Sequence, residues 1–272
     1  MATIDKTKFL GIDVSRWQDN DSTPQQVDWV KARKAGTKFC FIKCTQRLFI
    51  DGDFIYNWKK SKEAGIPRGT YCYLNYDISY ADQARFYARA LKESGDLGEL
   101  EAVADIEYRP MYSRAYDYLW GFLQVLEQEL PGKKLGIYCG PYYWQEMCVQ
   151  KWGYYRSVDA WKKYTLWGAH YETKALGYLG IDKNTGKEKW VDILPWGRDG
   201  WTYWQFGTPV VGREFGMESE ELDCNYYNGT EEQFRTVYKL GETQPELPLP
   251  ELTIEERVTI LEKKVAKAHP NI

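Results

Sequence analysis

Short apolar segments alternate with helical segments through the first two thirds of the chain, and this alternation constrains the fold more than any other feature. Strand-like runs occupy residues 9–14, 39–43, 69–74, 102–106 and 135–139. Helical patterns lie between them, at residues 27–35, 54–64, 81–92 and 114–130. Repeated strand–helix units bring their strands together in parallel. The sequence therefore predicts an α/β fold with a mostly parallel sheet or barrel.

The alternation weakens in the last third of the chain. Strands are predicted at residues 166–169, 201–206 and 221–225, with little helix between them. A long insertion separates Tyr171 from Trp201, and its residues 179–191 have the pattern of a hairpin that turns near Asn184-Thr185-Gly186. A barrel built on this sequence is expected to be irregular and poor in helix toward its end.

Two carboxylates close the predicted strand at residues 102–106. Side chains i and i+2 of a strand share a face about 6.6 Å apart, so Asp105 and Glu107 project together and Ile106 turns away. Each carboxylate raises the pKa of the other. A pair with one protonated and one ionised member is what glycoside hydrolysis requires. On this pattern alone, an acidic strand end facing solvent is an equally good interpretation.

Further polar side chains stand at other strand ends. Asp13 follows the first strand, Gln205 follows Tyr203-Trp204, and Asp223 and Asn225 lie two residues apart in the last strand. The active site of a parallel α/β barrel lies where its strands end. Four acids far apart in sequence are therefore expected to converge: Asp13, Asp105, Glu107 and Asp223. Lys43 is either a charge partner for one of them or part of a structural ion pair.

Composition argues against several other classes of protein. The net charge of −3 gives no basic field for nucleic acid or anionic membranes, and no apolar run approaches the roughly 20 residues of a membrane span. The six cysteines form no Cys-x-x-Cys pair and only two histidines are present, so we expect no metal, no cofactor and free buried thiols. Residues 1–8 are polar and lack the pattern of a signal peptide, which predicts synthesis in the cytoplasm.

The C-terminal segment has a different composition. Residues 241–251 contain three prolines and predict an extended linker. Residues 252–272 carry an apolar stripe at alternating spacings of four and three, namely Ile254, Val258, Leu261, Val265 and Ala268. This stripe is typical of a short coiled-coil helix. Because an isolated helix of this length is marginal in water, it either docks on the barrel or, as we favour, pairs with copies of itself.

Eight sequence blocks resemble, in order, those of the glycoside hydrolase family 25 lysozymes, many of which are phage endolysins. The first is Gly11-Ile12-Asp13-Val14-Ser15-Arg16-Trp17-Gln18. The others lie at residues 41–45, 69–73, 104–107, 136–138, 166–171, 203–206 and 222–225. The resemblance implies a flattened, irregular (β/α) TIM-like barrel, so residues 1–240 are expected to form the catalytic domain. One departure is Gln46-Arg47, where the family usually has an acid or polar residue and a glycine.

The resemblance also implies an activity. It is that of a muramidase, which cuts the β-1,4 bond between N-acetylmuramic acid and N-acetylglucosamine in bacterial peptidoglycan. The family's functional acids carry over onto Asp13, Asp105, Glu107 and Asp223. The cell-wall-binding repeats of many relatives are absent. With no signal peptide expected, such an enzyme would reach the wall after release from the producing cell or as part of a particle.

Roles for the acids follow from the chemistry. Glu107 is expected to be the general acid, with a pKa raised by burial and by a neighbouring anion. Asp105 is expected to stay ionised. It could serve a retaining or an inverting reaction, and we favour retention assisted by the substrate's own acetamido oxygen. Asp13 and Asp223 would orient the acetamido group or a water molecule.

Several side chains near the strand ends are candidates for holding the glycan. They are Tyr73, Tyr108, Tyr138, Tyr171, Trp204, Gln205 and Asn225. Packing in the core explains each aromatic residue about equally well. Two other functions stay open, an inactive barrel that only binds cell wall and a glycosidase for another N-acetylated polysaccharide such as chitin. The presence of all four acids argues against the inactive barrel.

Overall fold

The computed structural model describes residues 4–20, 22–23, 26–107, 115–144, 158–171, 195–197, 200–209 and 211–241. The described elements lie within the unit Met1–Leu240. Several predicted features lie outside the described residues: Tyr108, Cys148, the hairpin at residues 179–191, the linker beyond Gly241 and the helix at residues 252–272. No described helix is long and apolar enough to cross a membrane.

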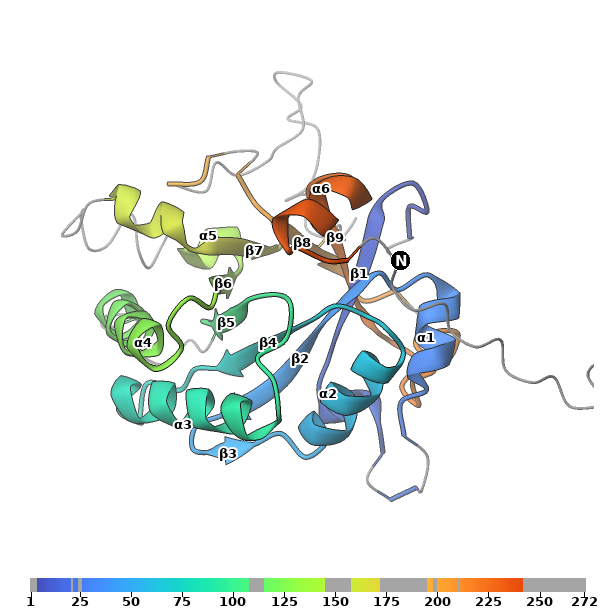
Figure 1. The fold of residues 1–272 in the computed structure, drawn as a ribbon, viewed down its shortest axis with the longest axis horizontal. Helices are drawn as coiled ribbons and strands as arrows, with labels where there is room; N and C mark the ends of the chain where they lie inside the picture. The colour runs from blue at the N-terminus through green and yellow to red at the C-terminus, as the bar shows by residue number, and fades with distance from the viewer. Residues whose placement is uncertain are drawn as a thin grey trace, which may run out of the picture. The chain divides into compact units, whose positions relative to one another are not determined.

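Eight strands form a closed barrel (Figure 1). They are β1 (Phe9–Val14), β2 (Phe39–Gln46), β4 (Arg68–Tyr73), β5 (Ala102–Asp105), β6 (Leu135–Cys139), β7 (Thr165–Ala169), β8 (Tyr203–Gly207) and β9 (Asp223–Tyr227). The pairs from β1 through β2 and β4 to β8 are parallel, and β9 closes the ring antiparallel to both β8 and β1. The predicted barrel with an irregular end is confirmed.

The helices follow the strands in the first half of the chain and lie on the outside of the barrel (Figure 1). They are α1 (Trp29–Ala35), α2 (Phe54–Glu63), α3 (Tyr80–Glu93) and α4 (Ala115–Glu129). Asp28 caps α1 and Ser79 caps α3, each by accepting a backbone N–H of the first turn. The predicted apolar stripe of α3 is buried. Later helices are short: α5 (Pro141–Trp144), the 3₁₀ helix η4 (Val158–Lys163) and α6 (Glu231–Val237).

Several short elements were not predicted from the sequence, α5 and η4 among them. Strand β3 (Phe49–Ile50) forms a two-residue hairpin arm with β2, and α6 begins at a capping box made by Thr230 and Gln233. Both are too short to show a hydrophobic period. The turn between β2 and β3 contains Arg47 at φ 54°, a conformation in which glycine is more at ease. The departure from the family pattern at Gln46-Arg47 therefore forms a tight hairpin beside the barrel mouth.

Alternate residues of each strand face the barrel interior and the helices. On β2, Phe39 and Phe41 face the interior, while Cys40 and Ile42 pack in the layer that includes the helices. The interior side chains form an inner aromatic cluster, whose aromatic members are Phe39, Phe41, Tyr138, Trp167, Tyr203, Tyr227, Phe234 and Tyr238. The five described cysteines are buried free thiols, as predicted. The rings of Phe41 and Trp167 stack at 4.4 Å between centroids. The inner aromatic cluster thus fills the barrel below the strand ends and leaves polar side chains above it.

Candidate active site

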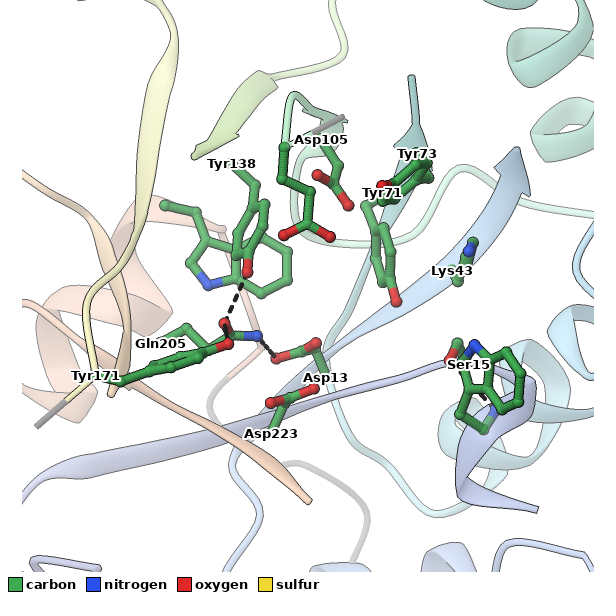
Figure 2. Close-up of a pocket in the computed structure, with 13 residues that line it drawn as sticks. Asp13, Ser15, Lys43, Tyr71, Tyr73, Asp105, Tyr138, Tyr171, Gln205 and Asp223 are labelled. Carbon is green, nitrogen blue, oxygen red and sulfur yellow. Dashed lines mark hydrogen bonds between the residues drawn. The ribbon is translucent and has the colours of Figure 1, made fainter. Parts of the chain in front are cut away.

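A pocket of about 230 Å³ opens at the carboxyl ends of the parallel strands (Figure 2). Its lining comes from all eight barrel strands and the segments that follow them. The lining residues are Asp13, Ser15, Trp17, Lys43, Tyr71, Tyr73, Asp105, Glu107, Tyr138, Trp167, Tyr171, Gln205 and Asp223. The four acids predicted from strand ends therefore converge in one cavity.

Asp105 and Glu107 share a face, as their spacing predicts, but differ in exposure. Strand β5 ends at Asp105, which is 4% exposed, and Ile106 is fully buried on the opposite side. Glu107 is exposed in the pocket. The expectation that burial acts on Glu107 therefore fails for the unbound protein, because the chain leaves the strand at this point. Asp105, and not Glu107, is the buried acid of the pair.

The electrostatics of Asp105 reflect that burial. Loss of solvation and the neighbouring Glu107 carboxylate raise the pKa of Asp105 well above its usual range, while Lys43 opposes the rise. Asp105 Oδ1 is buried and makes no hydrogen bond to any described residue. The two acids form a coupled pair that readily holds one proton. An unpartnered carboxylate oxygen is also available to a polar group of a ligand.

Asp13 is fixed by two amides. Its Oδ2 accepts hydrogen bonds from Asn225 Nδ2 at 2.8 Å and from Gln205 Nε2 at 2.9 Å. Burial raises the pKa of Asp13 to about 6, against the effect of these two bonds and with a contribution from Glu107. Asn225 in turn accepts from Trp167 Nε1 at 2.7 Å. Asp13 is thus a rigid carboxylate that titrates close to neutral pH.

Asp223 lies beside Asp13 because β1 and β9 run antiparallel with these two residues in register. Burial, Asp13 and Glu107 raise the pKa of Asp223 to about 8. Its Oδ1 is buried without a hydrogen-bond partner among the described residues. Neighbouring acids with separated pKa values can divide proton donation and charge stabilisation between them at neutral pH.

Gln205 connects Asp13 to two tyrosines that line the pocket. Its Oε1 accepts from Tyr138 Oη at 2.7 Å and from Tyr171 Oη at 2.5 Å, while its amide nitrogen donates to Asp13 (Figure 2). All polar atoms of this side chain except one amide hydrogen are therefore committed. Gln205 orients the side chains around it.

The predicted substrate-binding residues divide into three groups. Tyr73, Tyr138, Tyr171 and Gln205 line the pocket with the acids. Asn225 lies one layer deeper and contacts Asp13. Trp204 is on the other face of β8, where its Nε1 donates to His170 O at 2.7 Å and its ring packs on Tyr226. Because Gln205 faces inward, the alternation of side chains along a strand directs Trp204 outward.

Four lining residues were not singled out from the sequence: Ser15, Trp17, Tyr71 and Trp167. Tyr71 could have been found, since it shares a face of β4 with Tyr73. Lys43 Nζ donates to Gln46 Oε1 at 2.8 Å and lies 5.0 Å from the ring centroid of Tyr73. Lys43 acts on Asp105 through its charge rather than through a direct ion pair. No group of described side chains has the arrangement of a metal site.

Comparison with known proteins shows the family of this chain. The sequence model of the glycosyl hydrolases family 25 matches residues 12–211. The uncharacterised protein YegX of Escherichia coli K12 is 31% identical over 235 residues, which cover 83% of this chain and 71% of YegX. Lysozyme M1 of Streptomyces globisporus is 27% identical over 236 residues, covering 83% of this chain and 70% of that protein.

A solved structure supports the architecture. The bacterial lysozyme from Streptomyces coelicolor superposes with a TM-score of 0.62 at 24% identity, over 84% of this chain and 96% of that one. At this identity the likeness concerns the fold. Its match over most of this chain indicates that the two proteins share their fold.

Proposed function

Because the chain belongs to glycosyl hydrolase family 25, we propose that its pocket of four acids is the active site of a muramidase. The chain is a glycoside hydrolase by family. The proposed substrate bond is the β-1,4 bond between N-acetylmuramic acid and N-acetylglucosamine in peptidoglycan. The observation that carries this proposal is the convergence of Asp13, Asp105, Glu107 and Asp223 in one cavity. The relative named Lysozyme M1 supports the choice of substrate.

Glu107 is the proposed general acid. It is the exposed member of the acid pair, so it can reach the glycosidic oxygen of a bound glycan. A glycan that fills the pocket removes water from Glu107 and favours its protonated form. With the shared proton on Glu107, its Coulombic effect on Asp105 disappears, and the charge of Lys43 then opposes the burial that raises the pKa of Asp105.

Asp105 is the proposed stabiliser of a reaction assisted by the substrate. The acetamido oxygen bonds to the anomeric carbon while the bond to the leaving oxygen breaks and Glu107 donates its proton. The unpartnered Oδ1 of Asp105 is available to the acetamido N–H and to the positive charge that develops in the new ring. A water molecule then opens that ring and gives its proton to Glu107. Asp13 and Asp223 orient the acetamido group and the water.

The stereochemistry of the product tests this mechanism. Substrate assistance displaces the anomeric carbon twice, so the first product observed by NMR is expected to retain the β configuration. A fresh α product would show a single displacement by water and would rule out substrate assistance. The acid pair would then act as acid and base on opposite faces of the sugar.

Product analysis tests the substrate and separates the alternatives. Purified peptidoglycan digested with the full chain is expected to yield fragments with N-acetylmuramic acid at the reducing end, detected by mass spectrometry after borohydride reduction. Fragments ending in N-acetylglucosamine, or cleavage confined to chitin oligosaccharides, would contradict the proposed bond specificity. Binding to walls without any new reducing ends would favour the barrel that only binds.

We further propose that residues 252–272 associate with copies of the same segment, since their apolar stripe follows a heptad spacing. Several catalytic barrels on one assembly would increase residence on an insoluble wall without separate wall-binding repeats. The enzyme would act on the wall after release from the producing cell or as part of a particle.

A further inference from the structure

Trp17 is the most exposed large apolar side chain of the described residues, at 69%, and it lines the pocket. Most tryptophans of the described residues are buried or half-buried in the hydrophobic core. Exposure of an indole costs free energy because apolar surface stays in water. Because Trp17 lines the pocket with the four acids, a ligand bound in the pocket would cover its exposed indole ring.

The backbone beneath Trp17 is held firmly. Trp17 lies in the 3₁₀ helix η1 (Arg16–Gln18), which Ser15 and Gln18 close with a capping box. Arg16 N donates to Asp51 Oδ1 at 3.0 Å, and Glu218 N donates to Gln18 O at 3.0 Å. These bonds fix η1 to the segment after β3 on one side and to the loop before β9 on the other. An aromatic ring on such a support loses little entropy when it binds.

The backbone that carries Trp17 leaves β1 on the side of the pocket where Ser15 lies. Figure 2 shows Tyr171 and Gln205 on one side of Asp13 and Asp223, with Ser15 and Lys43 on the other. Trp17 follows Ser15 by two residues in η1. Tyr171 is itself 42% exposed. The exposed rings of Trp17 and Tyr171 both line the pocket that holds the acids.

We propose that Trp17 is the platform for a second sugar, so that the glycan crosses the acids from Tyr171 to Trp17; this rests on the proposed muramidase function. A pyranose presents a face of C–H groups that stacks on an indole, and its hydroxyls remain free for hydrogen bonds. The Arg16 guanidinium lies 4.8 Å from the indole centroid. The Arg16 guanidinium covers part of the indole ring, and the sugar would stack on the part of the ring that stays exposed.

Steady-state kinetics on a defined substrate test the platform. The substrate is a peptide-free tetrasaccharide of alternating N-acetylglucosamine and N-acetylmuramic acid, and the proteins are the full chain and its variants. Trp17→Ala is expected to raise KM about tenfold with kcat within about twofold, since stacking contributes mainly to binding. Trp17→Phe should restore most of the loss. A melting temperature within a few degrees of the wild type excludes a stability defect, so a raised KM with the wild-type kcat then supports the platform.

The matched control is Ile55→Ala, which removes another exposed apolar side chain, 55% exposed, on α2 and outside the pocket lining. Its KM is expected to equal that of the wild type. If Trp17→Ala gives the same KM as Ile55→Ala on a tetrasaccharide that the wild type cleaves, the platform is refuted. If the wild type does not cleave the tetrasaccharide, the proposed muramidase function fails instead.

Discussion

Asp105 and Glu107, the two acids at the end of β5, differ in their exposure to solvent. Asp105 is buried and has an unpartnered oxygen, while Glu107 stands in the open pocket. A buried carboxyl can hold charge against a fixed substrate group, whereas an exposed one can approach the leaving oxygen. The difference gives the two acids separate roles, and both side chains point to the same face because of their i, i+2 spacing.

Asn225 tunes Asp13 and offers a test at the level of a single hydrogen bond. Its bond lowers the pKa of Asp13, so Asn225→Ala should raise that pKa above its value of about 6. Asp13 then takes up its proton at higher pH. The acidic limb of the kcat/KM profile on peptidoglycan is expected to move upward by about one pH unit.

Asn57→Ala is the matched control for Asn225→Ala. Asn57 is also buried and also accepts from a tryptophan, Trp29 Nε1 at 3.0 Å, but lies outside the pocket lining. It should lower the melting temperature without moving the pH profile. If the acidic limb of the kcat/KM profile is unchanged in Asn225→Ala, protonation of Asp13 does not cause that limb.

The ionised carboxylate of Asp223 is expected to lower the stability of the folded protein at neutral pH. Its folded pKa of about 8 lies above the usual 3.8, so the folded state binds the proton more tightly than the unfolded state does. Stability is therefore highest below about pH 4 for this group and falls as the pH rises from about 4 to 8. Asp223→Asn should increase the free energy of unfolding at pH 8, by on the order of 3 kcal/mol, while lowering activity.

Urea denaturation at pH 4 and pH 8 measures this effect. The gain in Asp223→Asn should be small at pH 4 and large at pH 8. Asp82→Asn serves as control, because the side chain of Asp82 is 61% exposed on α3. Equal gains at both pH values would contradict the electrostatic origin of the effect.

Close approach of aromatic rings governs packing among the elements. A Cβ at Gly69 on β4 would lie 2.3 Å from the ring of Phe41 on β2 and 2.8 Å from Glu101 O. Gly69→Ala should therefore force apart two paired strands and cost about 2–3 kcal/mol in thermal or urea denaturation.

Gly52→Ala provides the comparison for Gly69→Ala, since nothing lies within 4 Å of a Cβ there. It should change stability by less than about 0.5 kcal/mol. A tolerated alanine at position 69 would mean that the inner aromatic cluster repacks easily, contrary to the tight interior described above.

The elements also show what a sequence pattern can predict. Strand β6 was predicted with its observed bounds, and α3 followed its apolar stripe to within a residue at either end, because both have a clear period. The period of two also brought Asp13, Asp105 and Asp223 to one barrel end. Ser15 and Trp17 belong to no strand, so only the tertiary bonds of η1 direct Trp17 into the pocket.

The closed barrel explains how acids from both ends of the chain meet. Strand β9 returns antiparallel between β8 and β1, which places Asp223 beside Asp13 across more than 200 residues of sequence. The sequence predicted a parallel barrel with an irregular end but contained no signal for this direction. Register between distant strands depends on closure of the whole ring.

Deletion of residues 241–272 tests the proposed assembly of the whole molecule. Light scattering should show an oligomer for the full chain and a monomer for the shortened one. Activity on a soluble tetrasaccharide should be the same for both, whereas clearing of insoluble walls should fall about tenfold or more as avidity is lost. A full chain that stays monomeric at high concentration, or unchanged clearing by the shortened chain, would contradict the proposal.

The most direct test of the four-acid site is the release of reducing ends from purified Gram-positive peptidoglycan by Glu107→Gln. Glutamine keeps the shape of Glu107 but cannot donate the proton to the leaving oxygen. We expect a loss of more than about two orders of magnitude in rate, with the same melting temperature within a few degrees and retained binding to walls. A variant that still releases reducing ends at a rate close to the wild type would contradict the assignment of Glu107 as the general acid.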